Sequence, residues 1–340
     1  MQQPAAQIPV AEHPTTRAQP RLRYLPISFF AMVLGLAGTT IAFQRAEKLL
    51  GLPLAISGYL LVGATTAFLV VAALYIAKLI RHPDAVRHEF AHPIKINFFP
   101  TISISMLLLS IAFLQINADV SRLLWMAGTI VQTLFTIVII SNWMQHTTFQ
   151  VNHSNPSWFI PVVGNVIIPI TGVEHAPIDV SWFFFSIGLI FWIALFTIFL
   201  NRIIFHAPLA ERLLPTLFIM IAPPAVGFVA YVKLMEHAVD GFALDAFAKI
   251  LYYFALFVLI LLIAQYRQFI TIKFYLSWWA YSFPVAAITI ATILISSKTG
   301  GAFHQWLGYG LLVFLSILIV VLLVRTAGAI IQRQICVEEE

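Results

Sequence analysis

The stretch YSFPVAAI, residues 281–288, places a proline inside an apolar run that is long enough to cross a membrane. Three other stretches repeat this arrangement: FFPTISIS at 98–105, WFIPVVGN at 158–165 and IAPPAVGF at 221–228. Spacings of 61, 62 and 61 residues separate their prolines, which are Pro100, Pro161, Pro223 and Pro284. Each period is long enough for two membrane helices, so the sequence predicts a repeated helical hairpin whose copies all have the same orientation.

The composition places the chain in the membrane. Hydrophobic residues make up 61% of its 340 residues, charged residues only 10%, and the mean hydropathy is +0.93. Soluble domains carry about 25% charged residues, so this chain lacks the charge to cover a water-soluble surface. The net charge of +5 does not indicate a nucleic-acid partner, because Lys and Arg gather between the apolar runs. The single cysteine, Cys336, leaves no disulfide framework.

Ten apolar runs are candidates to span a bilayer, although the fifth is short. They are expected at 24–43, 55–79, 97–116, 122–144, 158–173, 181–203, 213–235, 246–266, 276–297 and 303–325. A disordered cytoplasmic tail at 1–23, a transmembrane domain at 24–328 and a second cytoplasmic tail at 329–340 complete the expected organisation. An even number of spans puts both termini on one side, and 13 of the 19 Lys and Arg residues fall on that side. The positive-inside rule therefore predicts cytoplasmic termini.

The parallel repeats predict a fold class. We expect an all-α integral membrane protein of ten transmembrane helices, arranged as five parallel helical hairpins in a quasi-five-fold ring around a central pore. The first hairpin lacks the proline phase, since Thr39 occupies that position. The residues expected to line or kink the pore are Pro100, Ser103, Pro161, Asn165, Pro223, Gly227 and Pro284. Small residues equally serve helix packing, and Asn165 equally fits a pore group or an interhelical hydrogen-bond partner.

The expected spans carry no ionisable side chain in their central parts. Ionisable groups at membrane depth mark proton relays and ion-coupled pumps. The sequence therefore favours a passive conduit over a proton-coupled mechanism.

The stretch HEFAHP, residues 88–93, spells the H-E-x-x-H motif of zinc metalloproteases. It falls in the loop between the second and third spans, where Pro93 ends any helix and no third ligand follows at a plausible position. We predict that this loop caps the start of the third span, and that the protein is not an enzyme and has no metal site and no cofactor.

The assembled motifs resemble the TehA and plant slow anion channel family over residues 24–328. FYLSWWAYSFPVA at 274–286 is similar to the ninth helix of the plant channels, and an E-F/Y-x-H-P motif occurs in the same loop as HEFAHP. Further likenesses are NPSWFIPVVGN at 155–165, IAPPAVGFVAY at 221–231 and AFAKILYYF at 246–254.

The resemblance implies a pore closed by Phe283 on the ninth helix and lined near its start by Phe30. Val33 stands where the bacterial channel of the family has a proline, which puts the pore shape near Phe30 in doubt. The absence of long phosphorylatable tails favours a bacterial protein of the inner membrane, in contact with membrane lipids. Relatives suggest a homo-oligomer with one pore per protomer, a trimer being favoured and a dimer possible.

Two functions follow from the resemblance. The first is a passive, weakly selective channel for inorganic monovalent anions such as chloride and nitrate. The alternative is a secondary transporter or exporter of dicarboxylate, sulfite or tellurite-type oxyanions. Since no Lys or Arg lies in the central parts of the expected spans, a pore without point charges should pass weakly hydrated anions best, with nitrate and iodide ahead of chloride.

Overall fold

The computed structural model describes residues 21–51, 55–145 and 149–336. Within these residues the chain is helical and contains ten helical segments long and apolar enough to cross a membrane. They are Ile27–Leu49, Ser57–Arg81, Lys95–Phe113, Ala118–Gln145, Pro156–His175, Ile178–Phe205, Glu211–Ala238, Ala246–Ala264, Leu276–Thr299 and Ala302–Ile331. The predicted all-α membrane fold with ten spans is confirmed. Most of the predicted tail at 1–23, and residues 337–340 of the other tail, lie outside the described residues.

The ten spans form an inner and an outer layer. The most apolar windows of the odd-numbered spans are 72–94% buried, whereas those of the even-numbered spans are 28–39% buried. Five long helices make the outer layer: α2 (Ser57–Arg81), α5 (Ala118–Gln145), α8 (Ile178–Phe205), α10 (Ala246–Ala264) and α13 (Ala302–Ile331). Their exposed faces carry large apolar side chains such as Leu69, Ile130 and Ile317, as a lipid-facing surface requires.

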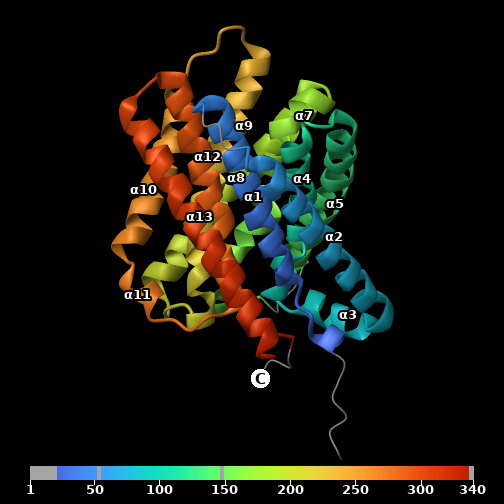
Figure 1. The fold of residues 1–340 in the computed structure, drawn as a ribbon. Coiled ribbons are helices and arrows are strands. Elements are labelled where there is room, and N and C mark those ends of the chain that lie inside the picture. Colours follow the sequence, from blue (N-terminus) through green and yellow to red (C-terminus); the bar gives the residue numbers. More distant parts are fainter. Residues whose placement is uncertain (1–20, 52–54, 146–148, 337–340) are drawn as a thin grey trace, which may run out of the picture.

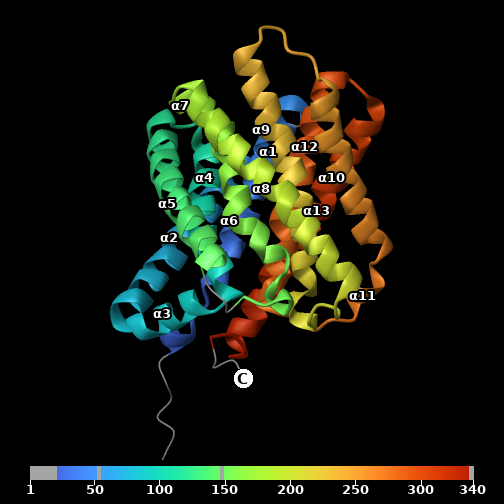
Figure 2. The same ribbon diagram turned by 180° about the vertical axis from the view of Figure 1, so that it is seen from behind.

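The inner spans contact one another in a closed circuit. Their α-helical parts are α1 (Phe30–Leu49), α4 (Thr101–Phe113), α6 (Ile160–Ile167) with α7 (Pro169–His175), α9 (Ala222–Ala238) and α12 (Ser282–Thr299). Each contacts the next in chain order, and α12 contacts α1 to close the circuit. Each also packs on the outer helix that follows it, so the repeat is a hairpin. Figures 1 and 2 show both layers, with the blue start of the ribbon and the red end of α13 at the same end of the molecule.

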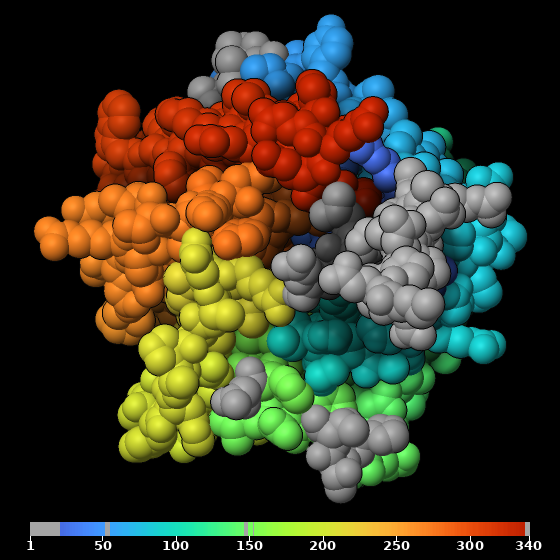
Figure 3. Space-filling model, turned by 90° about the horizontal axis from the view of Figure 1, so that it is seen from below, coloured from blue at the N-terminus to red at the C-terminus, as the bar shows by residue number. Residues whose placement is uncertain are grey.

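The view from that end shows the hairpins following one another around the molecule in sequence order (Figure 3). The last hairpin lies beside the first. We call this end the terminus side and the opposite end the far side. Because every inner span has the same orientation, its earlier residues lie toward the terminus side and its later residues toward the far side.

Each inner span begins as a 3₁₀ segment, and four of the five become α-helical at their proline. The 3₁₀ segments are η2 (Ile27–Phe29), η3 (Lys95–Phe98), η5 (Pro156–Phe159), η6 (Glu211–Ile221) and η7 (Leu276–Tyr281). Pro100 immediately precedes its α-helix, and Pro161, Pro223 and Pro284 occupy the second or third residue of theirs. Proline is tolerated in the first turn of an α-helix, where its missing N–H leaves no bond unmade. The proline period therefore marks the change from 3₁₀ to α in four repeats.

The first hairpin departs from this period for a structural reason. Its α-helix begins at Phe30, 71 residues before Thr101 begins α4. The extra length is taken up by a short helix, α3 (Pro83–Ala91), which lies between the second and third spans. Thr39, the position in phase with the prolines, is therefore well inside α1 rather than at its start. The remaining short elements are η1 (Arg21–Tyr24), η4 (Val151–His153) and α11 (Arg267–Ile270).

The HEFAHP stretch forms the end of α3 and the turn after it. His92 Nδ1 accepts hydrogen bonds from the N–H groups of Ile94 and Lys95, so His92 helps to cap the start of the third span as predicted. Glu89 contacts the first span and α2 instead. Its buried carboxylate accepts from the Ile27 N–H at 2.7 Å and pairs with Lys78 Nζ at 2.6 Å. The loop therefore contacts the first span and α2 in addition to capping the third span.

A buried polar network joins the fifth span to α5. Gln132 of α5 donates to the Pro161 carbonyl at 2.7 Å and accepts from Ser103 Oγ at 2.7 Å. Thr136 donates to the same carbonyl at 3.0 Å. The gap for the Gln132 amide exists because residue 164 is glycine, whose added Cβ would lie 2.2 Å from the Gln132 Cδ.

Gly164→Ala is therefore expected to destabilise the protein. Forcing atoms into a packed interior costs about 1–3 kcal/mol, and here it would also displace a hydrogen-bonded amide. Thermal unfolding of the detergent-purified protein measures the change. Gly63→Ala on α2 is the matched control, since no heavy atom lies within 4 Å of its added Cβ. Equal unfolding temperatures for the two variants would contradict the packing described.

Candidate functional site

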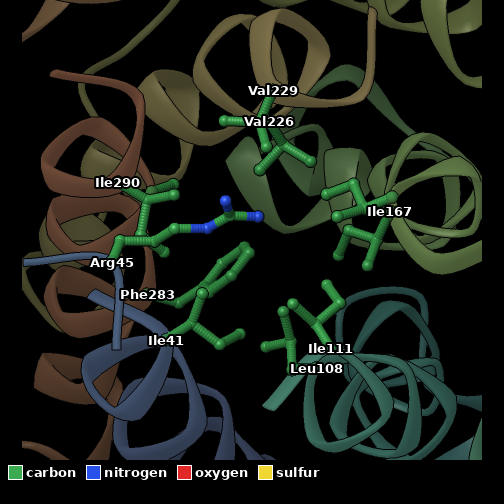
Figure 4. Close-up of a pocket in the computed structure, with 11 residues that line it drawn as sticks. Ile41, Arg45, Leu108, Ile111, Ile167, Val226, Val229, Phe283 and Ile290 are labelled. Carbon is green, nitrogen blue, oxygen red and sulfur yellow. The ribbon is translucent and has the colours of Figure 1, made fainter. Parts of the chain in front are cut away.

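Two cavities lie within the inner ring, one on each side of Phe283. The first, which we call the terminus-side cavity, has a volume of about 40 Å³. It is lined by Ala31, Leu34, Phe98, Thr101, Ile104, Ile160, Val163, Ile219, Ala222, Trp279, Ala280, Phe283 and Pro284. The second, the far cavity, has a volume of about 30 Å³. It is lined by Ile41, Arg45, Leu108, Ile111, Ile167, Ile170, Val226, Val229, Phe283, Ala287 and Ile290 (Figure 4).

All five inner spans contribute to both linings, and the far-cavity residues follow the terminus-side residues along each span. The two cavities are therefore stacked along the axis of the ring. Each exceeds the roughly 10–15 Å³ that one water needs, so each has room for a small solute.

Phe283 is the residue that both linings share. Its side chain is buried at 8% relative exposure, and its ring lies beside α1, where a Cβ added at Gly38 would be 3.4 Å from it. Pro284 follows it directly at the change from 3₁₀ to α in the ninth span. This change of helix type thus positions the ring between the two cavities.

The walls are apolar apart from two side chains, Thr101 in the terminus-side cavity and Arg45 in the far cavity. An anion between these walls meets no ring of polar ligands to replace its hydration shell. Hydrophobic constrictions block ions by staying dry as well as by occluding them. The Phe283 ring is therefore suited to act as such a barrier.

Arg45 corrects one prediction from the sequence. The first span was expected to end at residue 43, which would place Arg45 outside the membrane, but α1 continues to Leu49. The guanidinium points inward among Ile290, Val226 and Val229 beside the Phe283 ring (Figure 4). The expectation of a lining without point charges is therefore wrong at Arg45.

Further charges lie close to Arg45 near the far-side ends of α9 and α12. The Glu236 carboxylate accepts from Lys298 at 2.5 Å and pairs with Lys233 at 3.2 Å. Together with Arg45, these groups carry a net charge of +2. This group of side chains beside the far cavity is therefore locally electropositive, which attracts anions and repels cations.

Several predicted pore residues face the outer helices instead of the cavities. Ser103 donates to Gln132, and the Asn165 amide donates to Thr136 Oγ1 at 3.0 Å. The Asn165 side chain thus has the interhelical partner that was one of its two sequence interpretations. Phe30 packs edge-on against Phe68 of α2 at 6.3 Å between ring centroids.

The other predicted residues also lie outside both linings. A Cβ added at Gly227 would approach Leu251 of α10, so this glycine faces the outer layer. Pro100, Pro161 and Pro223 are buried where their spans become α-helical. Of the nine predicted residues, Phe283 and Pro284 line the cavities.

A family model described as voltage-dependent anion channel matches residues 24–327. The chain belongs to this family. The match runs from η1, just before the first span, into the last span, so the voltage-dependent anion channel domain includes all the residues that line both cavities.

Three relatives illustrate the range of this voltage-dependent anion channel family. The chain is 30% identical to the S-type anion channel SLAH3 of Arabidopsis thaliana over 92% of its own length, and it spans about half (49%) of that protein. It is 27% identical to an uncharacterized transporter of Methanocaldococcus jannaschii, over 89% of this chain and 94% of the relative. It is 26% identical to a tellurite resistance protein TehA homolog of Haemophilus influenzae, over 78% of this chain and 79% of the relative.

Proposed function

We propose that this protein is a passive channel for small inorganic anions, and that the Phe283 ring closes it. The observation that carries the proposal is the position of this ring, which stands between two stacked cavities on the axis of the inner layer. The family supports an anion channel or transporter, and the name of the Arabidopsis relative supports a channel.

The cavity walls support a passive mechanism over a coupled one. Proton-coupled transport uses carboxylate or histidine side chains along the path. Among the described residues, the linings of both cavities contain no Asp, Glu or His. Arg45 remains protonated at any physiological pH, so it offers charge without a titrating relay.

The charges support anions over cations as the permeating species. A cation that reaches the group beside the far cavity meets Arg45, Lys233 and Lys298 together with the Glu236 carboxylate, a local net charge of +2. A cation within the far cavity would in addition face the guanidinium at close range in an apolar surrounding, where Coulomb repulsion is strong.

A flux assay in proteoliposomes tests the passive mechanism. A potassium gradient with valinomycin sets the membrane potential at equal pH on both sides, and chloride release is measured. We expect the wild type to exceed empty liposomes only slightly, and Phe283→Ala to release chloride at a rate that follows the potential. Chloride release that requires a pH gradient, and is insensitive to potential, would contradict the passive mechanism. The same dependence measured for a dicarboxylate, sulfite or tellurite-type oxyanion would instead support the coupled transporter.

We further propose that the protein lies in a bacterial inner membrane with both termini in the cytoplasm. The excess of Lys and Arg on the terminus side supports this orientation through the positive-inside rule. The exposed apolar faces of the outer helices suit contact with lipids and with other copies of the chain. A homo-oligomer, as a trimer or a dimer with one pore per protomer, fits this surface.

A further inference from the structure

Arg45 has an unusual position for a guanidinium. It is carried by α1 into the far cavity, where the remaining lining residues are apolar. Among the described residues it forms no hydrogen bond within 3.5 Å and no ion pair within 4.0 Å. This half-buried guanidinium therefore presents its five N–H donors to the cavity without a protein acceptor.

The carboxylate that could pair with Arg45 is held by two lysines. Glu236 interacts with Arg45 electrostatically but makes its close contacts with Lys298 at 2.5 Å and Lys233 at 3.2 Å. The lysines come from α12 and α9, so the ion cluster connects neighbouring inner spans. This arrangement keeps the Arg45 donors available for another acceptor.

We propose that Arg45 is a binding site for one small monovalent anion in the far cavity, on the far side of the Phe283 ring. This inference rests on the proposed anion conduction, because it names the residue that holds the anion before it reaches the ring. The guanidinium supplies the charge and the hydrogen bonds, and the apolar walls supply none.

The charge of the preferred ligand follows from this geometry. Arg45 is the one charged residue in the far-cavity lining, whereas Lys233 and Lys298 lie outside that lining and pair with Glu236. A divalent anion in the cavity would keep a second charge in contact with apolar walls, at a large desolvation cost. The cavity volume of about 30 Å³ also excludes a large organic anion. The site therefore selects small monovalent anions over sulfate or a dicarboxylate.

The first test measures conductance against chloride concentration in the Phe283→Ala background. We expect Arg45→Gln to raise the half-saturating chloride concentration about tenfold or more, because hydrogen bonds to a charged group are lost. Arg45→Lys, which keeps the charge, should stay much closer to the parent. Lys48→Gln is the control, since Lys48 is an exposed cation of the same helix outside the cavity lining.

Unchanged saturation in Arg45→Gln, or an equal shift in Lys48→Gln, would overturn the site while leaving anion conduction intact. If Phe283→Ala conducts no anion at all, the proposed function fails instead. The binding site is then judged by a second measurement that needs no conduction.

The second measurement uses the wild-type protein in detergent. Chloride is varied against gluconate, which is too large for the cavity, at constant ionic strength, and the thermal unfolding midpoint is recorded. A ligand that binds the folded state stabilises it in a saturable manner. We expect a saturable rise for the wild type and Lys48→Gln, and a flat response for Arg45→Gln. Identical responses in all three proteins would overturn the proposal.

Discussion

Phe283→Ala is expected to convert a nearly silent protein into one that conducts anions constitutively. The ring separates two cavities, so its removal joins them into one path. The dry constriction disappears with it, and an anion would no longer shed its water without a replacement ligand. A fall of only about 2.7 kcal/mol in this barrier raises the rate about 100-fold, so we expect at least that increase. Currents across planar bilayers at equal protein amounts measure the change.

The competing interpretation is that Phe283 is an ordinary packing residue, which its low exposure also allows. Truncation would then cost about 3–5 kcal/mol of stability and reduce any transport. Phe228→Ala provides the matched control, because Phe228 is a fully buried ring of the inner layer that packs on Tyr252 of α10 rather than lining a cavity. A gain of conductance in Phe283→Ala alone supports the barrier. The same loss of stability in both variants, with no conductance in either, would contradict it.

Glu89→Ala is expected to cost about 3–5 kcal/mol of folding stability, because it leaves Lys78 charged, buried and unpaired. The Ile27 N–H and the Tyr75 hydroxyl would lose their acceptor as well. Lys78 also donates to the Leu25 carbonyl at 2.7 Å, so the pair fastens the start of the first span to α2 and α3. Thermal or denaturant unfolding of the purified protein measures the loss.

Two variants sharpen this test. Asp84→Ala removes the partner of Arg23 in an exposed pair, so it should cost less than about 1 kcal/mol. The double variant Lys78→Met with Glu89→Leu removes both buried charges and should be more stable than Glu89→Ala. If Glu89→Ala were no more costly than Asp84→Ala, the pair would not hold the first span in place.

The architecture was predictable because proline spacing and hydropathy are properties of the chain alone. Four prolines in one phase identified the hairpin repeat, and each proved to mark the change from 3₁₀ to α in an inner span. The division into inner and outer layers was less visible, since both kinds of span are apolar throughout. Only packing shows which spans cover the others.

Arg45 was missed because the apolar run ends at Phe43, whereas the helix continues. Hydropathy marks where the chain becomes polar, but a long Arg side chain can place its guanidinium several ångströms from its backbone position. A signal was nevertheless present in the helical phase. Leu34, Ile41 and Arg45 are seven and four residues apart, so they share a face of α1, and all three line the cavities.

Ser103 and Asn165 were expected in the pore from their sequence, but neither lines a cavity. Polar side chains inside apolar spans suggested a pore, but their partners Gln132 and Thr136 come from the outer layer. Polar groups within a membrane hydrogen-bond across helices wherever partners are available. Sequence spacing does not tell which neighbouring helix supplies the hydrogen-bond partner. A polar residue in an apolar span is therefore expected whether it lines a pore or bonds to another helix.

The measurement that tests the central claim most directly is the reversal potential of Phe283→Ala in a planar bilayer with a tenfold potassium chloride gradient. A passive anion path predicts reversal close to the chloride equilibrium potential, about 59 mV from zero for a singly charged ion, and no shift when a pH gradient is added. Reversal near the potassium equilibrium potential would contradict an anion path along this axis. Reversal that moves with the pH gradient would contradict its passive character.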